Sequence, residues 1–145
     1  MRTPASIAGH PIHPMLIVFP VGLLIFSLVC DLISTRSADP TTWALVAFYT
    51  MVGGFIGALV AAVPGLVDLL SLTDKAIKKT AITHMSINLV VVALYALNIW
   101  LRASATTNTN TGTPLLLSVV GIALLAVSGW LGGKMVHEHG VGVDV

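Results

Sequence analysis

Four long apolar stretches, separated by short polar segments, dominate the sequence. Each is long enough to match the roughly 20 residues that a helix needs to cross a hydrocarbon core of about 30 Å. Because that core offers no water to backbone N–H and C=O groups, a helix, which pairs them internally, is the expected structure. We expect four membrane helices at residues 14–34, 42–70, 81–101 and 113–134.

The composition agrees with lipid as the surrounding solvent. Hydrophobic residues make up 56% of the 145 residues. Charged residues make up 9%, against roughly a quarter in soluble domains, and a soluble protein of this size exposes too much surface for so few charges. The net charge of +1 provides no basic stripe for nucleic acid. We therefore expect the lipid bilayer as a partner and no nucleic acid.

The segments that link the apolar stretches are short, at residues 35–41, 71–80 and 102–112. Asp39 followed by Pro40 suits the start of a helix. Short connections make consecutive helices antiparallel neighbours. We predict one all-α domain over residues 1–145, an integral membrane up-down four-helix bundle with both termini on the same side.

The cations divide unequally between the two ends of this bundle. Side A is the end with both termini and the 71–80 connector, and side B is the opposite end. Side B carries only Arg36 and Arg102, so the positive-inside rule favours side A as cytoplasmic. The cations of side A are Arg2, Lys75, Lys78, Lys79 and Lys134.

Small residues recur on two of the expected helices. On the second helix they occupy every fourth position, at Gly53, Gly57, Ala61 and Gly65. Such a ridge lets helices approach closely in lipid, or leaves a slot for a flat cofactor, and it leaves room for a homo-oligomer. The fourth helix has a looser small face, formed by Ser118, Gly121, Ser128 and Gly132.

All five histidines of the sequence fall at side A. His10 and His13 lie just before or within the first turn of the first helix, and His84 lies near the start of the third. His137 and His139 follow the expected end of the fourth helix. Up-down threading brings these positions to one end of the bundle, although they are far apart in sequence.

Helical periodicity places further polar residues on inward faces. Asp68 follows Gly65 by three positions and shares its face, where we expect it to partner His84 or Asn88. On the third helix, a polar stripe faces the interior, because lipid exposure would be costly. The stripe comprises His84, Asn88, Tyr95, Asn98 and Arg102. Asp31, near side B, is expected to pair with Arg36 or Arg102 in a structural ion pair.

Imidazoles and a carboxylate that converge from several helices suit a transition metal ion such as Fe, Cu or Zn. They also suit a b-type haem, whose iron takes two axial histidines. We expect His13 and His84 as the leading cofactor ligands, with Asp68 orienting a ring and with Asn88 and Tyr95 in support. The wider candidate metal ligands are His10, His13, Asp68, His84 and His139.

Three interpretations of function follow. The first is a haem- or metal-binding subunit that transfers electrons at the cytoplasmic face to a redox partner protein. The second is a homo-oligomeric transport protein, in which Asp68 and His84 exchange protons and Asn88, Tyr95 and Asn98 line a path. The third is a structural helper that packs against a larger membrane complex, with histidines that are merely interfacial. No common hydrolase or nucleotide-binding motif is present, and the sequence leaves open whether the protein is an enzyme.

The segments GHPIHP at residues 9–14 and GGKMVHEHGVGV at residues 132–143 carry a family resemblance. With Gly65, Asp68 and His84 between them, the chain resembles the bacterial membrane proteins grouped as domain of unknown function 2231. The resemblance spans nearly the whole chain, implies a multi-pass protein of the bacterial inner (plasma) membrane, and marks His10, His13, Asp68, His84 and His139. Some similar domains are joined to a Rieske iron–sulfur domain, which implies electron transfer. This sequence contains no such domain and lacks the cysteines for one, which counts against a redox role unless a separate protein supplies the redox partner.

Overall fold

The predicted four-helix membrane fold is confirmed. The computed structural model describes residues 3–105 and 112–143. Within these ranges each of the four helices is long and apolar enough to cross a membrane. The helices are α1 (Ile12–Ser34), α2 (Pro40–Ser71), α3 (Lys75–Ser104) and α4 (Thr113–His139), and the short strands β1 (Ser6–Ile7) and β2 (His10–Pro11) precede them.

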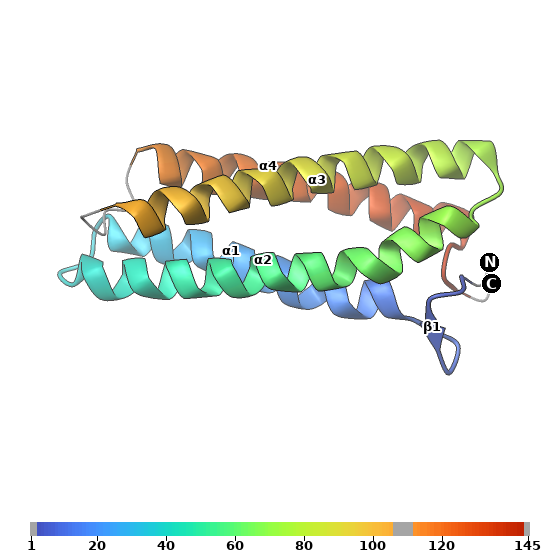
Figure 1. The fold of residues 1–145 in the computed structure, drawn as a ribbon, viewed down its shortest axis with the longest axis horizontal. Helices are drawn as coiled ribbons and strands as arrows, with labels where there is room; N and C mark the ends of the chain where they lie inside the picture. Colours follow the sequence, from blue (N-terminus) through green and yellow to red (C-terminus); the bar gives the residue numbers. More distant parts are fainter. Residues whose placement is uncertain (1–2, 106–111, 144–145) are drawn as a thin grey trace.

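The helices lie side by side along the long axis of the molecule (Figure 1). Both termini and the α2–α3 connection lie at one end, which is side A, and the α1–α2 connection lies at side B. This is the predicted up-down order. The helices pair most closely as two hairpins, α1 with α2 and α3 with α4, and the two hairpins contact each other less extensively. Arg2 and residues 106–111 of the expected third connector lie outside the described residues.

Two aspartates determine where α2 and α3 begin. The Asp39 carboxylate accepts a hydrogen bond from the Thr42 N–H at 3.1 Å, and Pro40 opens α2, as expected. Asp74 accepts from two backbone N–H groups of the first turn of α3. Because of this cap α3 begins at Lys75, within the segment 71–80 that we expected to be a connector. Apolar content indicates the span, whereas the capping residue determines the start of the helix.

The two ends of the chain differ from expectation at side A. A tight turn with Ala8 at φ 50° and Gly9 at φ 82° joins β1 to β2, so His10 lies in a small hairpin just before α1. At the other end α4 continues beyond its apolar part until Gly140 ends it in the left-handed conformation. His137 and His139 therefore lie in the last turn of α4 rather than after the helix.

The small-residue ridge of α2 packs against α1. A Cβ atom on Gly57 would lie 3.3 Å from Cδ of Pro20, and one on Gly54, which lies beside the ridge, would lie 2.7 Å from Cγ of Leu24. Side chains at these positions would force the two helices apart. The ridge therefore serves helix packing along most of its length, as the first interpretation of these glycines predicts.

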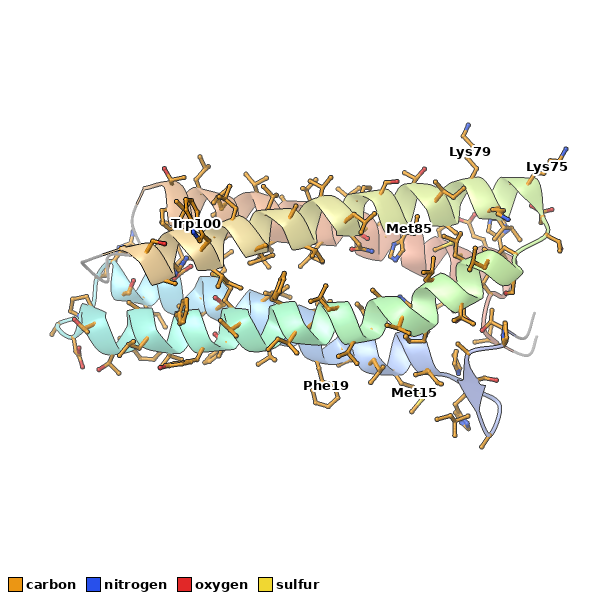
Figure 2. The ribbon with its side chains drawn as sticks, in the orientation of Figure 1. Met15, Phe19, Lys75, Lys79, Met85 and Trp100 are labelled. Atoms are coloured by element: carbon orange, nitrogen blue, oxygen red, sulfur yellow. The ribbon has the colours of Figure 1, made fainter. Side chains whose placement is uncertain are left out.

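An apolar cluster fills the middle of the bundle, formed by Leu24, Met51, Val91 and Tyr95, and we call it the apolar layer. The outside is apolar as well. Met15 and Phe19 point away from the bundle (Figure 2), and Phe19 is 70% exposed. Large apolar side chains on every outward face suit acyl chains rather than water.

Candidate functional site

His13 and His84 meet between the two hairpins near side A. His13 lies in the first turn of α1, and His84 lies in the first half of α3. Their ring centres are 6.4 Å apart, and their planes are perpendicular, at 90°. The structure thus brings together the two residues that the sequence marks as the leading cofactor ligands.

The His13 ring is held by the backbone of α2. Its Nδ1 lies 2.7 Å from the carbonyl oxygen of Ala61. Because a carbonyl oxygen can only accept a hydrogen bond, Nδ1 carries the proton and Nε2 keeps its lone pair. The ring lies directly on Gly65, where a Cβ atom would be 2.8 Å from Nδ1. This end of the glycine ridge therefore makes room for an imidazole.

The His84 ring is held by α4 in a similar way. Its Nδ1 lies 2.8 Å from the carbonyl oxygen of Ser128, so this ring is also protonated at Nδ1. The Ser128 hydroxyl donates to Oδ1 of Asn88 at 2.9 Å, which turns the amide Nδ2 of Asn88 toward Nε2 of His84 at 3.0 Å. Asn88, one of the two expected supporting residues, thus contacts His84 by donating to Nε2, the acceptor nitrogen of the imidazole.

Gly132 completes the surroundings of His84. A Cβ atom added to Gly132 would lie 3.4 Å from Cε1 of the ring. Each imidazole thus rests near a glycine of the neighbouring helix and donates to a backbone carbonyl of that helix. Such an outer hydrogen bond from Nδ1 is the arrangement that orients a histidine whose Nε2 binds a metal.

The remaining predicted ligands lie elsewhere. Oδ1 of Asp68 accepts a hydrogen bond from the backbone N–H of Ala5 at 3.0 Å, because the N-terminal segment folds across the end of α2. His10 is exposed and contacts the carbonyl of Ala8 at 3.1 Å, and His139 is exposed at the end of α4. Over residues 3–105 and 112–143, no three His, Cys, Asp or Glu side chains are grouped closely enough to hold a metal ion. The wider five-residue ligand set is therefore not assembled in this structure.

Tyr95, the other residue expected to support the histidines, lies in the apolar layer. It is about 16 Å along α3 from His84, at 1.5 Å per residue. The side chain is 2% exposed, and its hydroxyl has no hydrogen-bond partner among the described residues. Tyr95 thus packs the core, against Gly121 of α4, rather than contacting the histidines.

A second polar cluster is buried near side B. Arg102 donates to both oxygens of Asp31 at 2.7 Å, which confirms one of the two expected ion pairs, while Arg36 is exposed. Asn98 accepts from Nε of Arg102 at 2.8 Å and donates to the Ser118 hydroxyl at 3.0 Å. Ser118 closes the ring by donating to Asp31 at 3.1 Å. This cluster links α1 of one hairpin to α3 and α4 of the other.

The serines on the small face of α4 make polar contacts that the residue pattern alone does not predict. Ser118 and Ser128 face the polar stripe of α3 and bind it at both ends of the bundle. The sequence does contain a signal for this role: each serine shares a helical face with a glycine that packs against α3, Gly121 or Gly132. A serine on a face that packs closely against another helix can form a hydrogen bond with the backbone or a polar side chain of that helix.

A family model described as "Predicted membrane protein (DUF2231)" matches residues 9–145. The chain belongs to the DUF2231 family. The match includes all four helices and both His13 and His84. Neither the curated proteins nor the solved structures give a match to this chain. The function of this DUF2231 protein must therefore be argued from its own residues.

Proposed function

We propose that this DUF2231 protein is a membrane subunit that holds one b-type haem between His13 and His84 and uses it for electron transfer. The observation that carries the proposal is the pair of imidazoles from opposite hairpins, with ring centres 6.4 Å apart. Two imidazoles bound at about 2.0–2.1 Å on opposite sides of one metal ion have ring centres roughly 6 Å apart. The spacing of His13 and His84 therefore fits a shared iron.

The donor set favours haem over a bare metal ion. Haem iron already has four porphyrin nitrogens and needs only two axial ligands. A bare Fe, Cu or Zn ion at this position would need more donors than two imidazoles. The described residues bring no third His, Cys, Asp or Glu to the pair. A transition metal ion remains the second candidate, with water completing its coordination.

The neighbouring residues would orient the two ligands. The carbonyl groups of Ala61 and Ser128 accept from Nδ1 of the two rings, so that each ring keeps its lone pair on Nε2. Asn88 would release Nε2 of His84, because one lone pair serves either the amide or the metal. Gly65 and Gly132 keep the helix surface beside each ring flat. When bound, the haem supplies one-electron redox chemistry, and the protein sets its position and surroundings.

The charge distribution supports side A as the cytoplasmic face of a bacterial inner membrane. Lys75, Lys78 and Lys79 lie there, at the start of α3. At side B, Arg102 is buried in its ion pair with Asp31. Among the described residues at that end, Arg36 is therefore the exposed cation. This sharpens the positive-inside asymmetry. The electron would then be exchanged with a redox partner protein at the cytoplasmic face.

The proton-transport interpretation has less support. Its path would run along α3 from His84 and Asn88 through Tyr95 to Asn98. Tyr95 instead packs with Val91, Leu24 and Met51 in the apolar layer. An apolar layer opposes the passage of protons, because it offers no chain of hydrogen bonds. Asp68, which this interpretation expects to exchange protons with His84, accepts a hydrogen bond from the backbone N–H of Ala5 instead.

Titration of the detergent-purified protein with hemin tests the proposal. We expect saturation at one haem per chain with a low-spin spectrum, and at least roughly tenfold weaker binding in His13→Ala and in His84→Ala. His137→Ala is the matched control, because His137 is exposed in the last turn of α4. Circular dichroism verifies the helical content of each variant. Equal hemin binding by all four proteins would contradict the proposal, and bound Fe, Cu or Zn without haem would favour a bare ion.

A further inference from the structure

Three lysines surround a shallow hollow on the outer face of α3. Lys75, Lys78 and Lys79 line it together with Ile82 and Thr83, and its volume is about 310 Å³. Lys75 and Lys79 both project away from the bundle (Figure 2). The hollow lies on the surface of the first turns of α3, apart from the histidine pair in the interior.

The position of the hollow coincides with the expected edge of the bilayer. The outer face of α3 continues from Ile82, 45% exposed, through Leu89, 60% exposed, to Trp100, 63% exposed. Lys79 and Trp100 are separated by about 31 Å along the helix axis at 1.5 Å per residue, which matches a hydrocarbon core of roughly 30 Å. Indoles and lysines are typical of the two interfaces of a membrane helix. The lysines therefore stand at headgroup depth above a lipid-facing stripe.

Within the described residues, the three lysines of the hollow make no ion pair. None of its lining residues is acidic. In the described part of the chain, the nearby carboxylate of Asp74 accepts from the α3 backbone, and the ion pair of Glu138 is made with Lys134 on α4. Three ammonium groups that share one hollow without an acidic partner attract an anion, and each basic residue near a membrane surface adds to that attraction.

We propose that this hollow binds the headgroup phosphate of an anionic phospholipid. The ammonium groups of Lys75, Lys78 and Lys79 hold the phosphate, and Ile82 and Thr83 complete the lining of the hollow. One acyl chain lies along Ile82 and Leu89. A lipid fits better than a soluble anion or an acidic protein, because the charged hollow opens directly onto the exposed apolar side chains of Ile82 and Leu89, which suit an acyl chain.

Native mass spectrometry of the detergent-solubilised protein tests this. Phosphatidylglycerol and phosphatidylcholine with the same acyl chains are added at equal concentrations, and bound lipid is counted. We expect the wild type to bind phosphatidylglycerol at least tenfold more strongly. The variant K78Q/K79Q should lose most of this preference, because each lysine contributes about fivefold. K78R/K79R should keep the preference, and inorganic phosphate at the same concentration should not displace the lipid.

The control K134Q/R36Q removes the same number of charges from exposed positions outside the hollow. It should keep the wild-type lipid preference. If the wild type binds the two lipids equally, that measurement alone overturns the proposal. An equal loss of lipid preference in the control variant would also overturn it, because the preference would then depend on the total charge of the protein. Displacement of the lipid by inorganic phosphate would overturn it too, because the hollow would then bind a soluble anion.

Discussion

Arg102 of α3 donates from both terminal nitrogens to the two oxygens of Asp31 of α1, each at 2.7 Å. Asp31 is 0% exposed and Arg102 is 9% exposed, so neither charge has water to solvate it. Asn98 accepts a further hydrogen bond from Arg102, and Ser118 donates a further one to Asp31. This ion pair joins the two hairpins at side B, while His13 and His84 face each other across the same boundary at side A.

Removal of one partner of this pair should destabilise the protein strongly. Asp31→Asn leaves the Arg102 charge buried without a counter-charge, so we expect a loss of about 3–5 kcal/mol in the free energy of unfolding. The double variant Asp31→Leu with Arg102→Met should recover much of that loss, because it leaves no buried charge. Unfolding in a mixed-micelle denaturant series measures both. Arg36→Gln, which changes an exposed arginine, is the control. A double variant that is no more stable than Asp31→Asn would show that the unpaired charge is not the cause of the loss.

Gly65 should be intolerant of a side chain because of His13. The Cβ atom of Gly65→Ala would lie 2.8 Å from Nδ1 of the ring, so the ring or α1 must shift. We expect a loss of about 1–3 kcal/mol, which is typical of overpacking. Gly22→Ala is the matched control, because nothing lies within 4 Å of that position and helix propensity favours alanine. Thermal unfolding in detergent compares the two, and equal melting temperatures would show that the ring does not rest on Gly65.

The hydrogen bonds to backbone carbonyls predict the proton positions on both rings. Without haem, the neutral form of His13 and of His84 should be the tautomer protonated at Nδ1, since the carbonyl groups of Ala61 and Ser128 can only accept hydrogen bonds. Nitrogen NMR of protein with ¹⁵N-labelled histidine distinguishes this tautomer from the one protonated at Nε2. His137, which is exposed, provides the reference. A His84 ring protonated at Nε2 would remove the lone pair that the proposed ligand role requires.

Asp39 should titrate at an unusually low pH. Hydrogen bonds from the side chain and the backbone N–H of Thr42 hold the pKa of Asp39 below its usual value. Because folding lowers this pKa, ionised Asp39 stabilises the start of α2 above the unfolded pKa of about 3.9. That contribution is lost as the pH falls through the lower folded pKa. Carbon NMR of the carboxyl group gives the midpoint, which Thr42→Ala should raise; an unchanged midpoint in that variant would contradict the capping role.

The fold and the histidine pair were predictable from sequence because they depend on local properties. Helix length and apolar content identify the four spans, and up-down threading then places His13 and His84 at the same end. The stripe on α3 also predicted the pairing of Arg102 with Asp31, as one of two choices. These inferences need only helical periodicity and the number of crossings.

The failures concern features that depend on tertiary structure. Asp68 lies on the same helical face as Gly65, yet the N-terminal segment folds back and the N–H of Ala5 donates a hydrogen bond to the Asp68 carboxylate. The helical periodicity of α2 contains no information about where the N-terminal segment, more than sixty residues away in sequence, contacts this helix. The helix ends at Lys75 and His139 were missed because a cap, rather than apolar content, sets them. Sequence periodicity thus located the site but not all of its neighbours.

The absorption spectrum of the wild-type protein tests the central claim most directly. The protein is purified from cells supplied with a haem precursor and measured oxidised and after reduction with dithionite. Axial ligation by His13 and His84 predicts a Soret band, a sharp α band on reduction, and one haem per chain by pyridine haemochrome assay. The claim would be contradicted by a folded, helical protein that shows no Soret band under these conditions and binds no haem when hemin is added.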